Sequence, residues 1–205
     1  SSKVSTPLTV VLRDFLGLAE TAKEAKRIIN EGKVKVDGKI RKNERYSIGL
    51  MDVLELPDSD QSYRVLPGHG GRFILHPISK AETEYKLCRI VGKTTITGGK
   101  TQLNLHDGRS VLNEDGNYAV GDIVKLDVVG QEILDHIDFK PGVRVIIIGG
   151  RSQGQFGILL ELGPEPGKKR TATIRTPENN DVRTLARYVF AVGTEAPIIS
   201  LPGVE

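Results

Sequence analysis

Residues 21–45, TAKEAKRIINEGKVKVDGKIRKNER, contain the start of a helix, its end and a hairpin turn. Thr21 and Glu24 form a capping box, in which each side chain can bind a free backbone N–H group at the start of the helix. Gly32 stands where such a helix ends. Apolar and basic residues then alternate on both sides of Asp37-Gly38, a strong short-range hairpin signal. The stretch therefore predicts a helix followed by a two-stranded hairpin.

The spacing of apolar residues predicts which side chains of this segment are buried. In the hairpin, successive side chains point to opposite faces, so Val34 and Val36 point inward. Lys33 and Lys35 therefore point outward. Residues 51–56 predict a third strand, and Gly17 ends an earlier helical pattern. The apolar positions of the two helices are Leu8, Val11, Leu12 and Phe15 in the first, and Ala22, Ala25, Ile28 and Ile29 in the second. Residues 1–56 thus predict a small α+β domain.

The rest of the chain consists mainly of short apolar stretches separated by turn signals such as Gly98-Gly99, which predicts a mainly β protein. Residues 57–138 predict a central small β-barrel or sandwich domain. Residues 139–205 predict an SH3-like barrel, with strands expected over 143–148, 156–162, 172–174 and 188–192.

The net charge of the whole chain is only +3, but its distribution is uneven. Residues 1–56 and 139–205 each carry a net +3, whereas residues 57–138 carry a net −3. Within residues 23–45, nine Lys and Arg residues outnumber four Asp and Glu residues. The basic charge is therefore concentrated in the two ends of the chain, which makes these ends the candidates for contact with a polyanion.

The basic residues of the helix and the hairpin are the first candidate binding site. RNA phosphates require several cations on one rigid surface, and each neutralised phosphate releases counterions. An ordinary solvated charged face remains the alternative at this stage. The candidate RNA-binding residues are Lys23, Lys26, Arg27, Lys33, Lys35, Lys39, Arg41, Lys42 and Arg45.

A glycine-rich pattern near residue 150 is the second candidate. Glycine allows a tight turn between strands because it adopts positive φ without strain. The pattern surrounds the strand expected at 143–148, and Arg151 in its loop is a candidate phosphate contact. An ordinary glycine-rich hairpin is the alternative. The glycines are Gly142, Gly149, Gly150, Gly154 and Gly157.

These segments resemble known families. Residues 21–38 are similar to the αL RNA-binding domain, which a bacterial small-subunit ribosomal protein, pseudouridine synthases and tyrosyl-tRNA synthetases share. The glycine pattern resembles the KOW motif of ribosomal proteins and transcription elongation factors. A third set of motifs covers residues 46–53, 71–73, 84–88, 103–109 and 197–202. With these motifs in this order, the chain from about residue 6 onward resembles the archaeal and eukaryotic S-four-e family of small-subunit ribosomal proteins.

The family resemblance implies a structural constituent of the small ribosomal subunit that stabilises folded rRNA during translation, in the cytoplasm, without catalysis or a cofactor. Implied partners are small-subunit rRNA and neighbouring ribosomal proteins, with neither a membrane nor a small-molecule substrate, and the isolated chain is expected to be monomeric. The short ending after Leu201-Pro202 resembles archaeal members. Family members usually carry a basic arm before the first helix, where this chain has only residues 1–6. Two alternatives remain: a KOW-type factor acting transiently in translation or transcription, and an accessory of an RNA-modifying enzyme.

The patterns of common enzyme sites are incomplete in this sequence. A phosphate-binding loop ending at Gly92-Lys93 or Gly99-Lys100 would need glycine at position 87 or 94, where Leu87 and Thr94 stand. The four histidines lack ligand-like spacing for zinc. Cys88, the single cysteine, lies in an alternating strand and is expected to be a buried or half-buried structural thiol. With no tryptophan and five each of Phe and Tyr, the chain is expected to recognise RNA by shape.

Overall fold

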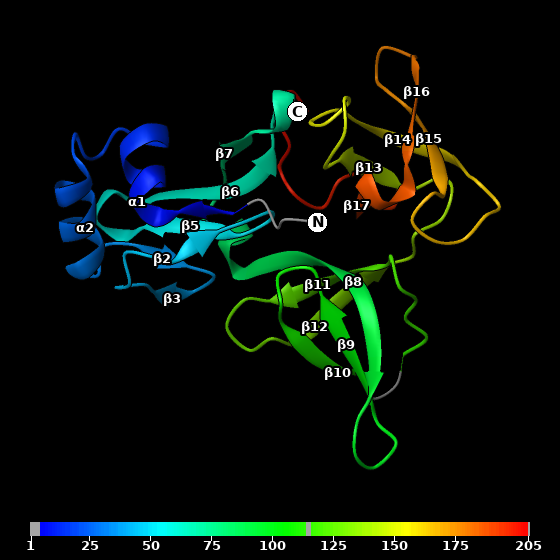
Figure 1. The fold of residues 1–205 in the computed structure, drawn as a ribbon, viewed down its shortest axis with the longest axis horizontal. Helices are drawn as coiled ribbons and strands as arrows, with labels where there is room; N and C mark the ends of the chain where they lie inside the picture. The colour runs from blue at the N-terminus through cyan, green and yellow to red at the C-terminus, as the bar shows by residue number, and fades with distance from the viewer. Residues whose placement is uncertain (1–4, 114–115, 205) are drawn as a thin grey trace. The chain divides into compact units, whose positions relative to one another are not determined.

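The computed structural model describes residues 5–113 and 116–204 (Figure 1). The chain forms two compact units, which we describe separately. The first takes in the described residues up to Leu66, together with Phe73–Lys86 and Asp127–Gly130. The second takes in Pro67–Arg72, Leu87–Leu126 and the residues from Gln131 onward. None of the described helices is both long enough and apolar enough to cross a membrane.

The first unit begins with two short helical segments that lie side by side (Figure 1). The first consists of α1 (Leu8–Val10) and a π-helical turn (Val11–Phe15), and the second is α2 (Ala22–Asn30). The Thr21 side chain accepts a hydrogen bond from the Glu24 backbone N–H group, 3.2 Å away. The Glu24 carboxylate binds the Glu20 N–H group instead of the Thr21 N–H group, so only half of the predicted capping box forms.

The buried face of these helices is narrower than the sequence predicts. Leu8, Val11, Leu12, Ala25 and Ile29 are buried, and Ile28 is half-buried. Phe15 and Ala22, by contrast, are exposed. Each stands at an end of its helical segment, Phe15 as its last residue and Ala22 as its first. These two core assignments were therefore wrong.

The sheet of the first unit has the strand order β3-β2-β5-β6-β7. A 3₁₀ turn at Pro57–Ser59 joins β5 to β6, and the two strands pair antiparallel. A further 3₁₀ turn follows at Ala81–Glu84, and β1 (Thr6–Pro7) pairs separately with β4 (Ser47–Ile48). The strands are β2 (Lys35–Val36), β3 (Lys39–Ile40), β5 (Val53–Leu56), β6 (Gln61–Pro67) and β7 (Phe73–Pro77).

The predicted hairpin forms between β2 and β3. Lys35 lies opposite Ile40 and Val36 opposite Lys39, so Asp37-Gly38 is a two-residue turn. Both turn residues have positive φ, 48° and 74°, as in the type I′ turns that suit β-hairpins. Val34 and Val36 are fully buried with the helices and β5 in one apolar core. The predicted inward position of Val34 and Val36 is thus confirmed, whereas the apolar Ile40, which lies opposite Lys35, is exposed.

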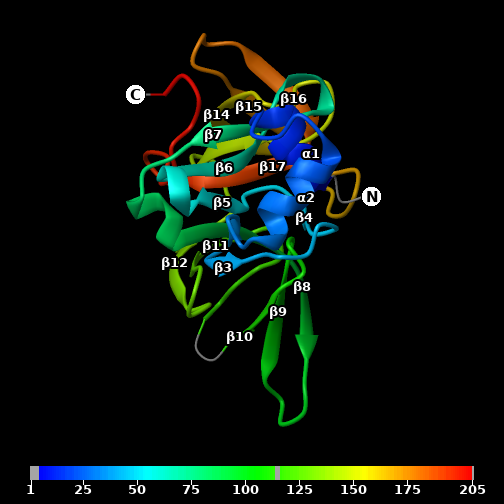
Figure 2. The same ribbon diagram turned by 90° about the vertical axis from the view of Figure 1, so that its left-hand side faces the viewer.

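The second unit contains a sheet with the strand order β10-β9-β8-β11-β12. Its core includes Cys88, Ile90, Leu103, Val124 and Leu126. The hairpin of β8 and β9 extends beyond the other strands of this sheet (Figure 2). The strands are β8 (Tyr85–Thr95), β9 (Thr101–Leu105), β10 (Ser110–Asn113), β11 (Ile123–Asp127) and β12 (Ile133–Ile137).

A third five-stranded sheet, also in the second unit, has the order β16-β15-β14-β13-β17. The sequence predicts four of these strands but not β16, whose side chains are exposed or only half-buried. 3₁₀ turns lie at His69–Gly71 and Ala186–Tyr188. The strands are β13 (Arg144–Ile147), β14 (Phe156–Leu162), β15 (Thr171–Arg175), β16 (Asp181–Leu185) and β17 (Val189–Gly193). The predicted mainly β fold with an α+β beginning is thus confirmed.

Candidate nucleic-acid interface

Three of the predicted RNA-binding residues lie on α2. Lys23, Lys26 and Arg27 are exposed, and the buried Ala25 and Ile29 hold the opposite face of the helix against the sheet. Gly32, with φ +76°, ends the helix in a Schellman arrangement: its N–H group binds the Ile29 carbonyl, and the Lys33 N–H group binds the Ile28 carbonyl. The rigid end of the helix thereby fixes where the hairpin begins.

The cations of the hairpin follow directly. Lys33 and Lys39 are exposed, and Lys35 is half-buried on β2, opposite Glu55 of β5. After β3, Lys42 and Arg45 are exposed in the loop that leads to β4. The predicted alternation accounts for Lys33 and Lys35. Lys39 lies opposite the buried Val36 and is exposed because β3 is an edge strand.

The end of the hairpin packs on the end of the helix. A Cβ atom on Gly32 would lie 3.2 Å from Lys42 Cε and 3.4 Å from the Ile40 methyl group. Arg41 is half-buried with its guanidinium over the Tyr46 ring, 4.3 Å from the centroid. Lys26 of α2 reaches Glu44 of the loop at 2.9 Å. The helix, the hairpin and the loop therefore form one continuous basic surface, which we call the αL surface (residues 23–45).

Ion pairs divide the cations of the αL surface into two groups. Lys26 pairs with Glu44, Arg27 with Glu31 at 2.8 Å, and Lys33 with Glu31 at 3.2 Å. The hydrogen bond with Glu31 raises the pKa of Arg27, and the bonds from Arg27 and Lys33 lower the pKa of Glu31. Within the described residues, no carboxylate oxygen lies within 4 Å of the side-chain nitrogens of Lys23, Lys35, Lys39, Lys42 or Arg45. These five are the cations most available to an external anion.

A buried ion cluster holds the hairpin turn in place. Lys86, at the start of β8, places its Nζ 3.0 Å from Asp37 Oδ2 and 2.5 Å from Asp52 Oδ1. Asp37 Oδ1 also accepts a hydrogen bond from the Val53 N–H group, and Asp52 Oδ2 accepts one from the Gly49 N–H group. All three side chains are almost fully buried. The Asp37-Gly38 turn, which leads to Lys39, is therefore anchored from inside the first unit. We call the three side chains the Lys86 cluster.

The sequence interpretation missed the Lys86 cluster, treating Asp37 only as a turn residue. One signal could have revealed it. Lys86, Cys88 and Ile90 stand at alternate positions of β8 and share its buried face. A lysine on a buried face requires a nearby carboxylate, because burying an unpaired charge is costly. The pattern therefore predicts that Lys86 has an acidic partner, although it does not say which one.

Burial gives Asp52 an unusual pKa. Desolvation is the largest influence and raises the pKa of Asp52 from 3.8 to about 6, the charge of Lys86 opposes this rise, and the charge of Asp37 adds to it. Between pH 3.8 and about 6, the Asp52 carboxylate therefore binds a proton more readily in the folded state than in the unfolded state. This contribution to stability is fully present below pH 3.8 and is lost as the pH rises through about 6.

We predict that Asp52→Asn removes this component of the pH dependence. The free energy of unfolding of the wild-type chain, measured relative to that of the variant, should fall as the pH rises from 3.8 to about 6. The fall should be at most about 3 kcal/mol, since one pKa unit corresponds to about 1.4 kcal/mol. Urea unfolding at several pH values measures it. Parallel pH profiles for the two proteins would contradict this assignment.

Arg151, the last predicted site residue, lies in the second unit, in the turn between β13 and β14, and is exposed. Gly142, Gly150 and Gly154 have the positive φ expected of them. At Gly149 and Gly157, glycine is needed instead because a side chain would not fit. A Cβ on Gly149 would lie 2.5 Å from the Tyr188 ring, and one on Gly157 would collide with the Arg175 carbonyl oxygen. The glycine pattern thus shapes the turn that presents Arg151.

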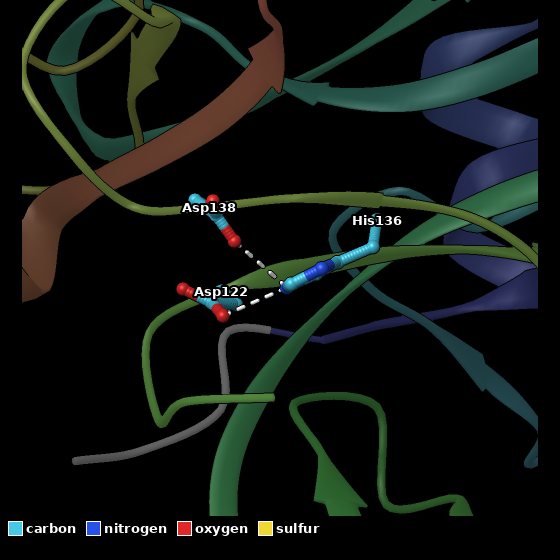
Figure 3. A group of neighbouring side chains, drawn as sticks. All are labelled: Asp122, His136 and Asp138. Carbon is cyan, nitrogen blue, oxygen red and sulfur yellow. Dashed lines mark hydrogen bonds and ion pairs between the residues drawn. The ribbon is translucent and has the colours of Figure 1, made fainter. Parts of the chain in front are cut away.

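The fold brings one histidine together with two carboxylates in the second unit (Figure 3). His136 Nε2 lies 2.8 Å from Asp122 Oδ2 and 3.4 Å from Asp138 Oδ1. The sequence spacing did not predict this group. Asp122 also accepts the backbone N–H groups of Ala119 and Phe139, at 2.9 Å each. These contacts occupy both of its oxygens and explain the group as a structural tie between β12 and the turn before β11.

The other candidate enzyme residues have structural positions. Cys88 is buried, as predicted, with its Sγ 3.7 Å from Asp107 Oδ2. Gly92-Lys93-Thr94 lies on β8, and Gly99-Lys100-Thr101 lies where the turn after it leads into β9, with Thr94 opposite Gln102. A phosphate-binding loop lies between a strand and a helix, so these two stretches are ordinary parts of a β-hairpin.

Comparison with sequence families agrees with the order of these elements. The model described as S4 domain matches residues 6–54, which contain the whole αL surface. The model described as Ribosomal family S4e matches residues 59–133. An S4 domain followed by an S4e segment and a further antiparallel sheet defines the class as S4e-type ribosomal proteins.

Full-length relatives make the assignment specific. The small ribosomal subunit protein eS4 of Methanothermobacter thermautotrophicus is 46% identical over 97% of this chain and 82% of its own length. The protein of the same name from Methanosphaera stadtmanae is 43% identical over the same shares. The crystal structure of the 30S ribosomal protein S4e from Thermoplasma acidophilum matches with a TM-score of 0.80 and 30% identity, over 95% of this chain and 97% of that chain. The chain belongs to the eS4 family, as the sequence resemblance predicted.

Proposed function

We propose that this chain is a non-catalytic structural constituent of the small ribosomal subunit, which binds and stabilises folded rRNA in the cytoplasm. The αL surface is the observation that carries the proposal. It presents exposed cations from a helix, a hairpin and a loop that contact one another, and five of these cations are without a carboxylate partner in the described parts of the chain. Several cations held at fixed spacing suit the phosphates of folded RNA.

The proposal assigns separate rRNA regions to the αL surface and the Arg151 turn, which belong to different compact units. We keep the division into residues 1–56, 57–138 and 139–205 as a proposal about function, with RNA contacts at the two ends and ribosomal protein neighbours along the middle. Contacts with phosphates and 2′-hydroxyl groups, rather than base reading, would give recognition by shape. The proposal includes a monomeric free chain and requires neither a cofactor nor a small-molecule substrate.

Co-sedimentation with small ribosomal subunits tests this role. An integral constituent should remain on the subunits after a high-salt wash, because contacts with neighbouring ribosomal proteins and with the assembled rRNA hold it in place even when its individual phosphate contacts are weakened by salt. A factor that acts transiently in translation or transcription, or in RNA modification, would be washed off. Release of the chain with the first wash would therefore reject the structural role and favour a transient one.

A further inference from the structure

A shallow hollow of about 400 Å³ lies beside the glycine-rich turn of the third sheet. Its wall is formed by the turn after β13, by β15 and β16, and by the 3₁₀ turn before β17. All of these belong to the second unit. The lining residues are Gly150, Arg151, Ser152, Thr171, Arg183, Thr184, Leu185 and Tyr188. We call it the Arg151 hollow.

Two unneutralised cations line the Arg151 hollow. Arg151 and Arg183 are exposed, and within the described residues neither forms an ion pair or a side-chain hydrogen bond. Their neighbour Arg175 differs, because it pairs with Asp181 through two hydrogen bonds of 2.9 and 3.3 Å. Asp181, the acidic residue of β16, is therefore already paired with Arg175. The hollow thus has a positive charge that nothing described in the chain neutralises.

Hydroxyl groups complete the polar lining. Ser152, Thr171 and Thr184 each offer a donor, and the Tyr188 hydroxyl accepts a hydrogen bond from Arg187 at 3.2 Å. The Tyr188 ring already packs against the turn, since a Cβ on Gly150 would lie 3.3 Å from it. The Arg187 guanidinium also lies over this ring, 5.0 Å from its centroid. With the ring so engaged, the hollow suits an anion better than a stacked base.

We propose that the Arg151 hollow binds one phosphodiester group of RNA, with Arg151 and Arg183 donating to the phosphate oxygens. Arginine is well suited to this task because its planar guanidinium can donate two parallel hydrogen bonds. The inference rests on the proposed rRNA-binding function and adds to it a defined phosphate site and a second cation, Arg183, on a strand that the sequence did not predict.

Titration of the full chain against small-subunit rRNA, at several salt concentrations, tests this proposal with four variants: Arg151→Gln, Arg183→Gln, the double variant and Arg175→Gln. The slope of log K against log salt is negative, and one lost phosphate contact should reduce its magnitude by about 0.7 to 0.9. The double variant should show this reduction and bind about tenfold or more weakly at fixed salt. Its unfolding curve should match the wild type, since both side chains are exposed and unbonded.

Arg175→Gln is the matched control, because it removes an arginine from the same sheet whose charge Asp181 already balances. It should leave the slope unchanged. A slope reduction of about 1.4 to 1.8 in the double variant would overturn the single-phosphate geometry, because it means two separate contacts. A wild-type slope in the double variant would overturn the site while leaving the αL surface and the proposed function intact. Failure of the wild-type chain itself to bind rRNA would instead reject the proposed function.

Inorganic phosphate distinguishes RNA from a small free anion as the ligand. If the hollow binds RNA, Arg183→Gln should bind rRNA more weakly than the wild type, because one of the two donors to the phosphate is lost. If inorganic phosphate binds the chain in an NMR titration and Arg183→Gln abolishes this without any change in rRNA affinity, the hollow is a small-anion site and the RNA proposal is wrong.

Discussion

Replacing Lys86 with methionine is expected to lower the free energy of unfolding by about 3–5 kcal/mol, one of the two largest effects that we predict. The substitution keeps most of the side chain's length but removes the cation that lies 3.0 Å from Asp37 and 2.5 Å from Asp52. Two buried carboxylates would then face each other without compensation. Denaturant unfolding followed by circular dichroism measures the loss.

Two further variants separate the charge from the packing. Lys100→Met, in the exposed turn between β8 and β9, should change stability by no more than about 0.5 kcal/mol. Adding Asp52→Asn to Lys86→Met should recover part of the loss, because one of the two unpaired negative charges is removed. A loss below about 1 kcal/mol for Lys86→Met would mean that the Lys86 cluster does not hold the hairpin turn as we describe.

The second large effect concerns the unpaired cations of the αL surface. Substituting Lys23, Lys39 and Arg45 with glutamine should reduce the magnitude of the negative slope of log K against log salt for rRNA binding by about 2 to 2.7. Affinity at fixed salt should fall by roughly 100-fold or more, because charged hydrogen bonds are lost at three positions. All three side chains are exposed, so the unfolding curve should be nearly unchanged.

A matched triple variant tests whether pairing matters. Lys26, Arg27 and Lys33 lie on the same surface, but each is within 3.2 Å of a carboxylate oxygen of Glu31 or Glu44. Substituting these three residues with glutamine should reduce the magnitude of the slope less than the first triple variant does. Equal losses from the two variants would show that the ion pairs open on binding. Unchanged binding in the first variant would show that the αL surface is an ordinary solvated face.

The sequence predicts the αL surface well because its signals are local. The cap at Thr21, the end at Gly32 and the turn at Asp37-Gly38 are each specified by neighbouring residues, and the structure places all three where the pattern predicts. Errors appear at the ends of the helical segments, at Phe15 and Ala22, which are exposed. Helical periodicity identifies an apolar face but not which of its residues, at the ends of the helix, are covered by other elements.

The Lys86 cluster and the Arg151 hollow could not be predicted from local patterns. Lys86 is 49 residues from Asp37 and 34 from Asp52, so only the fold identifies its partners. Arg183 stands on β16, a strand with weak alternation, and meets Arg151 only through the strand order of the third sheet. The roles of Gly149 and Gly157 likewise depend on Tyr188 and Arg175, more than ten residues away.

The salt dependence of rRNA binding tests the central claim most directly. The full wild-type chain is titrated with small-subunit rRNA between about 50 and 200 mM salt, a range over which phosphate contacts dominate the change in affinity. Five unpaired cations on the αL surface and one phosphate in the Arg151 hollow predict a slope of log K against log salt of roughly −4 to −5. A slope near zero, with binding retained at high salt, would contradict the claim that this chain holds rRNA through its phosphates.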